Sequence, residues 1–116
     1  MSLPKDAMLL RIYLGENEKY GHEPLYEAVV MKAREMSLAG ATVLRGPLGF
    51  GNSRHVHTTK ILRLADDLPL IVEIVDIEEK LRVFLDAIAD MVTSTLVTLE
   101  KVQVLQYGTN KNGIGG

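Results

Sequence analysis

Two amphipathic helical stretches, set among four strand-like stretches, constrain the fold of this chain more than any other feature. The first helix is expected to start near Leu25, because apolar residues recur every three or four positions from there to Met36. Pro24 stands where a first helical residue would, since its missing N–H costs nothing there. Gly40 is expected to end this helix.

The second helix is expected to open with a capping box, because Asp76 and Glu79 have the D-x-x-E spacing. The apolar stripe behind that box consists of Leu81, Phe84, Leu85, Ile88 and Val92. Such a stripe is typical of a helix that packs one face against a sheet.

The four strands are predicted from alternating or β-branched apolar runs. They cover Met8 to Leu14, Ala41 to Arg45, Leu68 to Val75 and Thr95 to Leu105. In the last run the alternation is disturbed between Leu99 and Val102, for which a β-bulge is one explanation.

The resulting order, βαββαβ, predicts an α+β, ferredoxin-like fold with a four-stranded antiparallel sheet. Right-handed crossovers place both helices on one face of that sheet and leave the other face open. The residues expected on the open face are Leu9, Arg11, Tyr13, Thr42, Leu44, Ile71, Glu73 and Val75. About half of them are apolar, which favours burial by self-association over a monomer with a mixed face.

Composition limits the functions open to the chain. Its 116 residues predict a single domain, 1–107, followed by a flexible Gly/Asn-rich tail, 108–116. There is no cysteine, and a net charge of −2 disfavours nucleic-acid binding. No apolar run reaches the ~20 residues that a membrane span needs, and no signal peptide is recognisable, so we expect a cytoplasmic protein without membrane insertion.

The connection from Gly46 to Asp67 is the least ordinary segment, because antiparallel neighbours need only a short turn. Between Met36 and Ala65 there is no acidic residue, whereas the rest of the chain is acidic overall. The basic residues of this segment are Arg45, Arg54, Lys60 and Arg63. A concentrated basic loop on an acidic protein predicts binding of a small anion; the alternative is a solvated run of charge.

A glycine-rich turn opens this connection. Glycines let the backbone approach a ligand, and successive N–H groups in such turns form anion-binding nests. The predicted nucleotide-binding residues are Arg45, Gly46, Gly49, Phe50, Gly51, Arg54 and, from the last strand, Lys101 of the same or a neighbouring subunit. The pattern is neither G-x-G-x-x-G nor a Walker A sequence, and a turn with no ligand is the simpler interpretation.

His55 and His57 offer a second interpretation. On a strand they would share a face and could hold a divalent metal with a third ligand from His22, Glu16 or Asp66. A metal-binding or metal-sensing trimer is therefore the alternative function. No nucleophile–base pair has supporting spacing, so we predict that the chain is not an enzyme and requires no cofactor.

Three segments together carry a resemblance to a known family. They are Ile12 to Glu16 (IYLGE), Arg45 to Gly51 (RGPLGFG) and Leu68 to Asp76 (LPLIVEIVD). Over Met8 to about Val104 the chain resembles the PII-like family of short bacterial and archaeal proteins catalogued as a domain of unknown function.

The resemblance implies a ferredoxin-like trimer in signal transduction, with an adenine nucleotide such as AMP bound between subunits. It also implies that the loop after the second strand is a ligand-responsive effector arm, whose partner could be a membrane transporter or channel protein. The chain has no tyrosine between Gly46 and Asp67, so tyrosine modification of the kind many PII proteins undergo is not expected.

Overall fold

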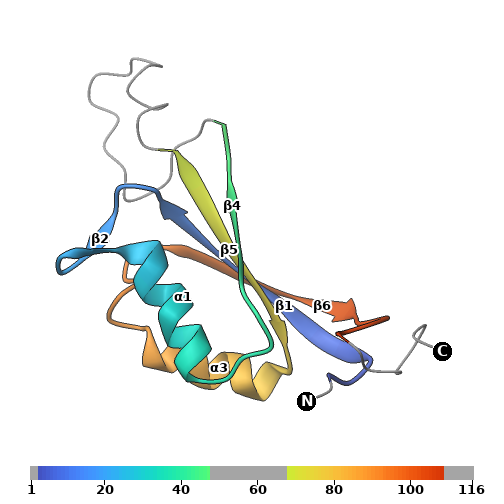
Figure 1. Ribbon diagram of the computed structural model, residues 1–116. Helices are drawn as coiled ribbons and strands as arrows, with labels where there is room; N and C mark the ends of the chain where they lie inside the picture. The colour runs from blue at the N-terminus through green and yellow to red at the C-terminus, as the bar shows by residue number, and fades with distance from the viewer. Residues whose placement is uncertain (1–2, 48–67, 109–116) are drawn as a thin grey trace.

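The computed structural model describes residues 3–47 and 68–108. Four strands form one antiparallel sheet in the order β4-β5-β1-β6. These are β1 (Asp6–Gly15), β4 (Thr42–Arg45), β5 (Pro69–Asp76) and β6 (Leu96–Gln103). Helices α1 (Leu25–Glu35) and α3 (Glu78–Ala87) lie on the same face of this sheet, as Figure 1 shows. The predicted ferredoxin-like α+β fold is confirmed.

A short hairpin of β2 (Lys19–Tyr20) and β3 (Glu23–Pro24) lies between β1 and α1. Tyr20 Oη donates a hydrogen bond of 2.9 Å to Asp90 Oδ2 beyond α3. This bond raises the pKa of the Tyr20 phenol above its ordinary value, because the nearby carboxylate disfavours the phenolate.

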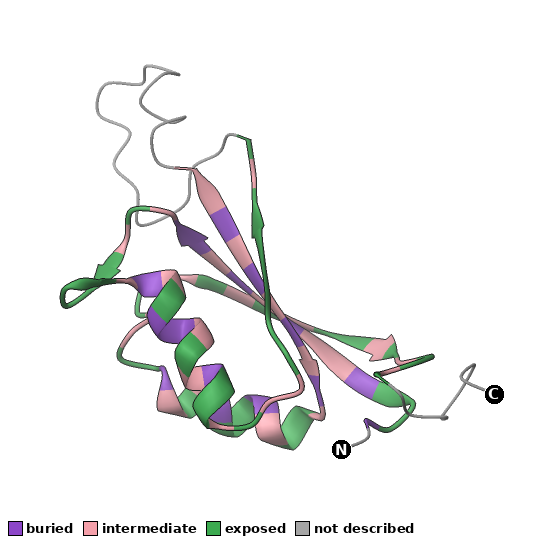
Figure 2. Ribbon diagram, in the orientation of Figure 1, coloured by how far each residue is buried: buried purple, intermediate pink, exposed green. Residues whose placement is uncertain are grey.

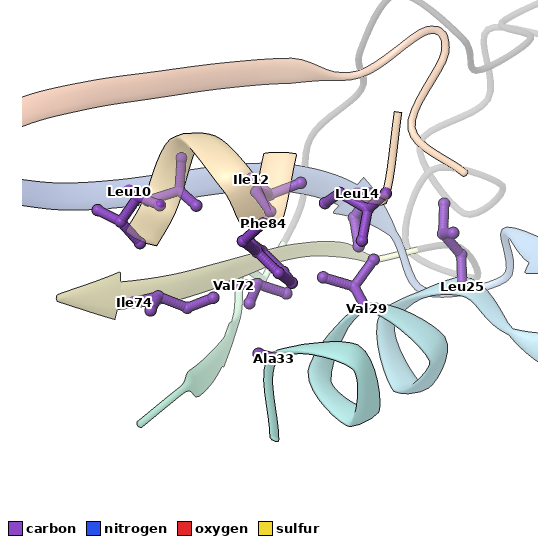
Figure 3. Packing of buried hydrophobic residues seen from close by; sticks show 11 residues of the cluster. Leu10, Ile12, Leu14, Leu25, Val29, Ala33, Val72, Ile74 and Phe84 are labelled. Atoms are coloured by element: carbon purple, nitrogen blue, oxygen red, sulfur yellow. The ribbon is translucent and has the colours of Figure 1, made fainter. Parts of the chain in front are cut away.

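The core lies between the sheet and the two helices (Figure 3). Leu10, Ile12 and Leu14 point from β1 toward the helices, and Val72 and Ile74 do so from β5. Phe84 of α3 is the largest of the fully buried side chains. Residues therefore alternate between half-buried and buried from Leu9 to Leu14 in β1 and along all of β5, as period-two side-chain placement requires (Figure 2).

The end of α1 differs from the sequence prediction. The helix stops at Glu35, before Gly40, because Ser37 adopts a left-handed φ of 59°. Two bonds complete a Schellman motif, from Ser37 N to Arg34 O (3.0 Å) and from Leu38 N to Ala33 O (3.1 Å). At the start of α1, Pro24 is the N-cap with ψ of 135° and not the first helical residue as predicted, so the helix begins one position later, at Leu25.

The predicted capping box of α3 is wrong. Ile77 is the N-cap, so Asp76 still belongs to β5 and stands one residue too early to cap the helix. Its buried carboxylate instead accepts hydrogen bonds from Ile77 N (2.8 Å) and Ala39 N (2.9 Å). The helix also ends at Ala87, so Val92 packs against the core from outside it.

The predicted bulge in the last strand is also wrong. The pairing of β6 with β1 runs without interruption from Asp6–Gln103 to Tyr13–Leu96. The alternation is weak because β6 is an edge strand whose residues are all exposed or half-buried. An edge strand needs less regular apolar patterning than a central one.

Candidate functional site: an arginine at the base of the long connection

Three chain segments meet where β4 ends and β5 begins, at the end of the sheet away from the N-terminus (Figure 1). Gly46 N donates to Pro69 O at 2.8 Å, which continues the β4–β5 ladder by one bond. Glu16 N donates to Leu68 O at 2.8 Å, which attaches the segment after β1 to the same point. The two ends of the basic connection are therefore fastened to each other and to β1.

Arg45 is the charged group at this junction. The Arg45 guanidinium lies 2.5 Å from Glu16 Oε2, and the two side chains are 57% and 27% exposed. No sequence signal pairs these residues, since 29 positions separate them. Sequence reasoning considered Glu16 only as a third metal ligand, whereas the structure places it on the arginine predicted to bind phosphate.

Gly46 is needed here for close packing. A Cβ atom at this position would stand 2.8 Å from Pro69 Cγ, closer than real Cβ contacts. Because the Gly46 N–H already donates to Pro69 O, it is not open to an anion in this arrangement. The contribution of Gly46 to ligand binding stays a prediction.

Lys101 lies far from Arg45 within one subunit. Lys101 of β6 pairs with Met8 of β1. Arg45 of β4 pairs with Leu70 of β5, and Leu70 pairs with Leu14 of β1. Leu14 lies six residues beyond Met8 on β1. At about 3.3 Å per residue, the two side chains start about 20 Å apart along the sheet. Lys101 instead lines a separate hollow of about 610 Å³ beside the start of α3. Only a neighbouring subunit could bring the two cations to one ligand.

The remaining predicted residues lie outside the described part of the chain. These are Gly49, Phe50, Gly51, Arg54, His55 and His57. Within residues 3–47 and 68–108, no cluster of three or more His, Cys, Asp or Glu side chains is placed to hold a metal ion. The same two ranges contain no helix long and apolar enough to cross a membrane.

The open face of the sheet is as predicted: the strand register places its eight expected residues on the side away from the helices. At its centre Arg11 bridges two strands, with Nε 2.8 Å from Glu73 Oε2 and Nη1 2.7 Å from Glu100 Oε1. The bond to Glu73 raises the pKa of the Arg11 guanidinium above its ordinary value. Around this charged cluster, Leu44 is 44% and Leu96 is 61% exposed.

Sequence reasoning missed a groove at the opposite end of the open face. Its volume is about 730 Å³, and its walls include Leu9, Val75 and Tyr107. Tyr107 Oη donates to Ala39 O at 2.7 Å, so the residues after β6 are attached to the segment between α1 and β4. The sequence around Tyr107, next to a polar, glycine-rich tail, gives no indication of its hydrogen bond to Ala39.

Solved structures define the class of fold. The CPII protein of Thiomonas intermedia K12, solved with ADP, AMP and acetate, matches with a TM-score of 0.62 and 18% identity, over 91% of this chain and 94% of that one. A putative PII-like signaling protein from Thermus thermophilus matches with a TM-score of 0.59 and 18% identity, over 90% and 93%. The fold is thus that of the PII-like proteins.

The chain belongs to the DUF190 family, described as "Uncharacterized ACR, COG1993", whose model matches residues 7–104. A UPF0166 protein of Aquifex aeolicus (strain VF5) is 39% identical over 97 residues, covering 84% of this chain and 91% of the relative. The UPF0166 protein MJ1524 of Methanocaldococcus jannaschii is 40% identical over 75 residues, covering 65% and 68%. The predicted membership of a family of unknown function is confirmed, and the fold of that family is PII-like as predicted.

Proposed function

We propose that this protein is a PII-like regulator that binds an adenine nucleotide at the base of its long connection, between subunits of a trimer. The observation that carries the proposal is Arg45: a guanidinium 57% exposed, on the last residue of β4, where the basic connection begins. The fold supports it, since CPII, a nitrogen regulatory PII-like protein, was solved with ADP, AMP and bicarbonate.

The chemistry of the proposed contact is charge-assisted hydrogen bonding. A guanidinium presents two parallel N–H groups to two phosphate oxygens, which suits arginine to this role better than lysine. Arg54 and the glycine-rich turn are proposed to complete the phosphate contacts, and Lys101 of a neighbouring subunit to add a further charge. Nucleotide binding would order the connection and change what a partner, such as a membrane transporter or channel protein, can contact. The protein would act in the cytoplasm, without catalysis and without a required cofactor.

Isothermal titration with AMP, ADP, ATP and cyclic AMP tests the ligand. We expect saturable binding of at least one nucleotide and a loss of about 10- to 100-fold in affinity in Arg45→Ala, because a hydrogen bond to a charged group contributes ~1.5–3 kcal/mol. The matched control is Arg82→Ala, which removes an exposed arginine on α3 that pairs with Glu78. Absence of binding by the wild type up to millimolar nucleotide would overturn the proposal.

Sedimentation velocity tests the trimer. Ile71 lies on the open face, between Tyr13 and Leu44 on the adjacent strands. If the open face is the contact between subunits, Ile71→Asp buries an unpaired charge and should shift the protein to monomer. Val83→Asp, at an apolar residue on α3 that is 59% exposed, should leave the oligomer intact. A wild type that sediments as a monomer at micromolar concentration would contradict the proposal.

A further inference from the structure

The partner of Arg45 is itself an anion. Glu16 places a carboxylate oxygen 2.5 Å from the guanidinium, at the position where a bound phosphate oxygen would lie. The backbone of Glu16 is held by its N–H bond to Leu68 O, so the carboxylate is presented from a fixed point. It is also the less exposed of the two side chains, at 27% against 57%.

A second carboxylate at the same turn is placed differently. Glu18 Oε1 accepts a hydrogen bond of 2.6 Å from Gly15 N, and so closes the turn after β1. Two glutamates two positions apart thus have separate roles: Glu18 satisfies a backbone group, while Glu16 neutralises Arg45.

From this geometry we infer that Glu16 is an internal competitor for the ligand: it occupies Arg45 until a phosphate displaces it, and so sets the affinity of the site. The inference rests on the proposed binding of nucleotide phosphate by Arg45. According to this inference Glu16 weakens nucleotide binding, although it lies in the same site as Arg45, which provides the binding.

The expected gain in nucleotide affinity follows from the solvent exposure of the Arg45–Glu16 ion pair. Ion pairs between exposed side chains contribute about 0.2–1 kcal/mol, so removal of the competing charge should tighten binding by up to about fivefold. Because breaking the ion pair is a step on the protein side, the gain should be the same for AMP, ADP and ATP. Simple repulsion between Glu16 and the ligand predicts instead a gain that grows with ligand charge.

The test is a set of titrations with these three nucleotides. Glu16→Gln keeps the shape of the side chain and removes its charge, and Glu18→Gln removes a charge from the same turn without touching Arg45. We expect Glu16→Gln to bind each nucleotide about two- to fivefold more tightly than the wild type, and Glu18→Gln to change affinity by less than half of that. In an Arg45→Ala background, Glu16→Gln should give no gain, since the ion pair is already absent.

Each alternative outcome has a distinct meaning. Wild-type binding that depends on Arg45, with no gain in Glu16→Gln, overturns the inference and leaves the proposed function standing. An equal gain in affinity in Glu18→Gln would also overturn the inference alone. The same holds for a gain in Glu16→Gln that rises from AMP to ATP. Absence of nucleotide binding in every variant overturns the proposed function, and the inference with it.

Discussion

Replacement of Phe84 by alanine is expected to lower the free energy of unfolding by about 3–5 kcal/mol. Phe84 has no exposed surface and is the largest of the fully buried side chains, packed among residues of β1, β5 and α1 (Figure 3). Its removal costs the transfer free energy of the ring and leaves a cavity that the surrounding sheet and helix cannot fill. Since domains of this size are stable by ~5–15 kcal/mol, the loss is a large part of the total.

Urea unfolding followed by circular dichroism measures this effect, at one protein concentration because self-association adds to apparent stability. The neighbouring Val83→Ala is the control, since Val83 is 59% exposed on the outer face of the same helix and should change stability by less than ~0.5 kcal/mol. If Phe84→Ala does not fold, Phe84→Leu should still lose about 1–2 kcal/mol. A loss below about 1 kcal/mol in Phe84→Ala would contradict the described packing.

Replacement of Asp76 by alanine should cost about 2–4 kcal/mol. Asp76 is 1% exposed, the one polar residue among those the structure describes that is buried to this degree. Its carboxylate accepts from the N–H groups of Ile77 and Ala39, and Lys80 Nζ lies 3.7 Å away. Alanine leaves two part-buried backbone donors without this acceptor; an unsatisfied buried group costs ~1–3 kcal/mol, and partial burial places each donor in the lower part of that range.

The same urea titration tests Asp76, with Asp86→Ala on the exposed face of α3 as the control. Asp76→Asn should lose less than Asp76→Ala, because its amide oxygen can still accept one of the two bonds. Stability of Asp76→Ala within about 0.5 kcal/mol of the wild type would show that Asp76 does not hold these segments together. A loss equal in Asp76→Asn and Asp76→Ala would show that the charge, and not the hydrogen bonds, matters.

Asp76 also shows why local patterns misplace the ends of elements. The D-x-x-E spacing predicted that Asp76 caps a helix, but the helix starts at Glu78. The Asp76 carboxylate instead accepts a hydrogen bond from the N–H of Ala39, 37 positions away. The carbonyl oxygen of the same residue, Ala39, accepts a hydrogen bond from Tyr107 Oη. Gly40 was expected to end α1, yet a left-handed Ser37 does so, because Leu38 packs against the core just after it.

Sequence patterns were enough to predict the order of the two helices and of the four strands of the main sheet, and the two faces of that sheet. Periods of two and of three to four residues reflect only which side of a strand or helix is buried, and that information is local. Phe84 was therefore predicted to face the sheet, and Arg11, Ile71 and Glu73 were predicted to lie on its open face.

The partners of the charged groups, in contrast, depend on contacts between segments that are distant in the sequence. Arg45 could be predicted as an anion-binding residue from the charge of its segment, but its contact with Glu16 depends on where β1 and β4 end in space. The distance between Arg45 and Lys101 likewise follows from strand register. Their positions in the sheet are six residues of β1 apart, which corresponds to about 20 Å. Charge and period are properties of neighbouring residues in the chain, whereas a binding site is made by residues that only folding brings together.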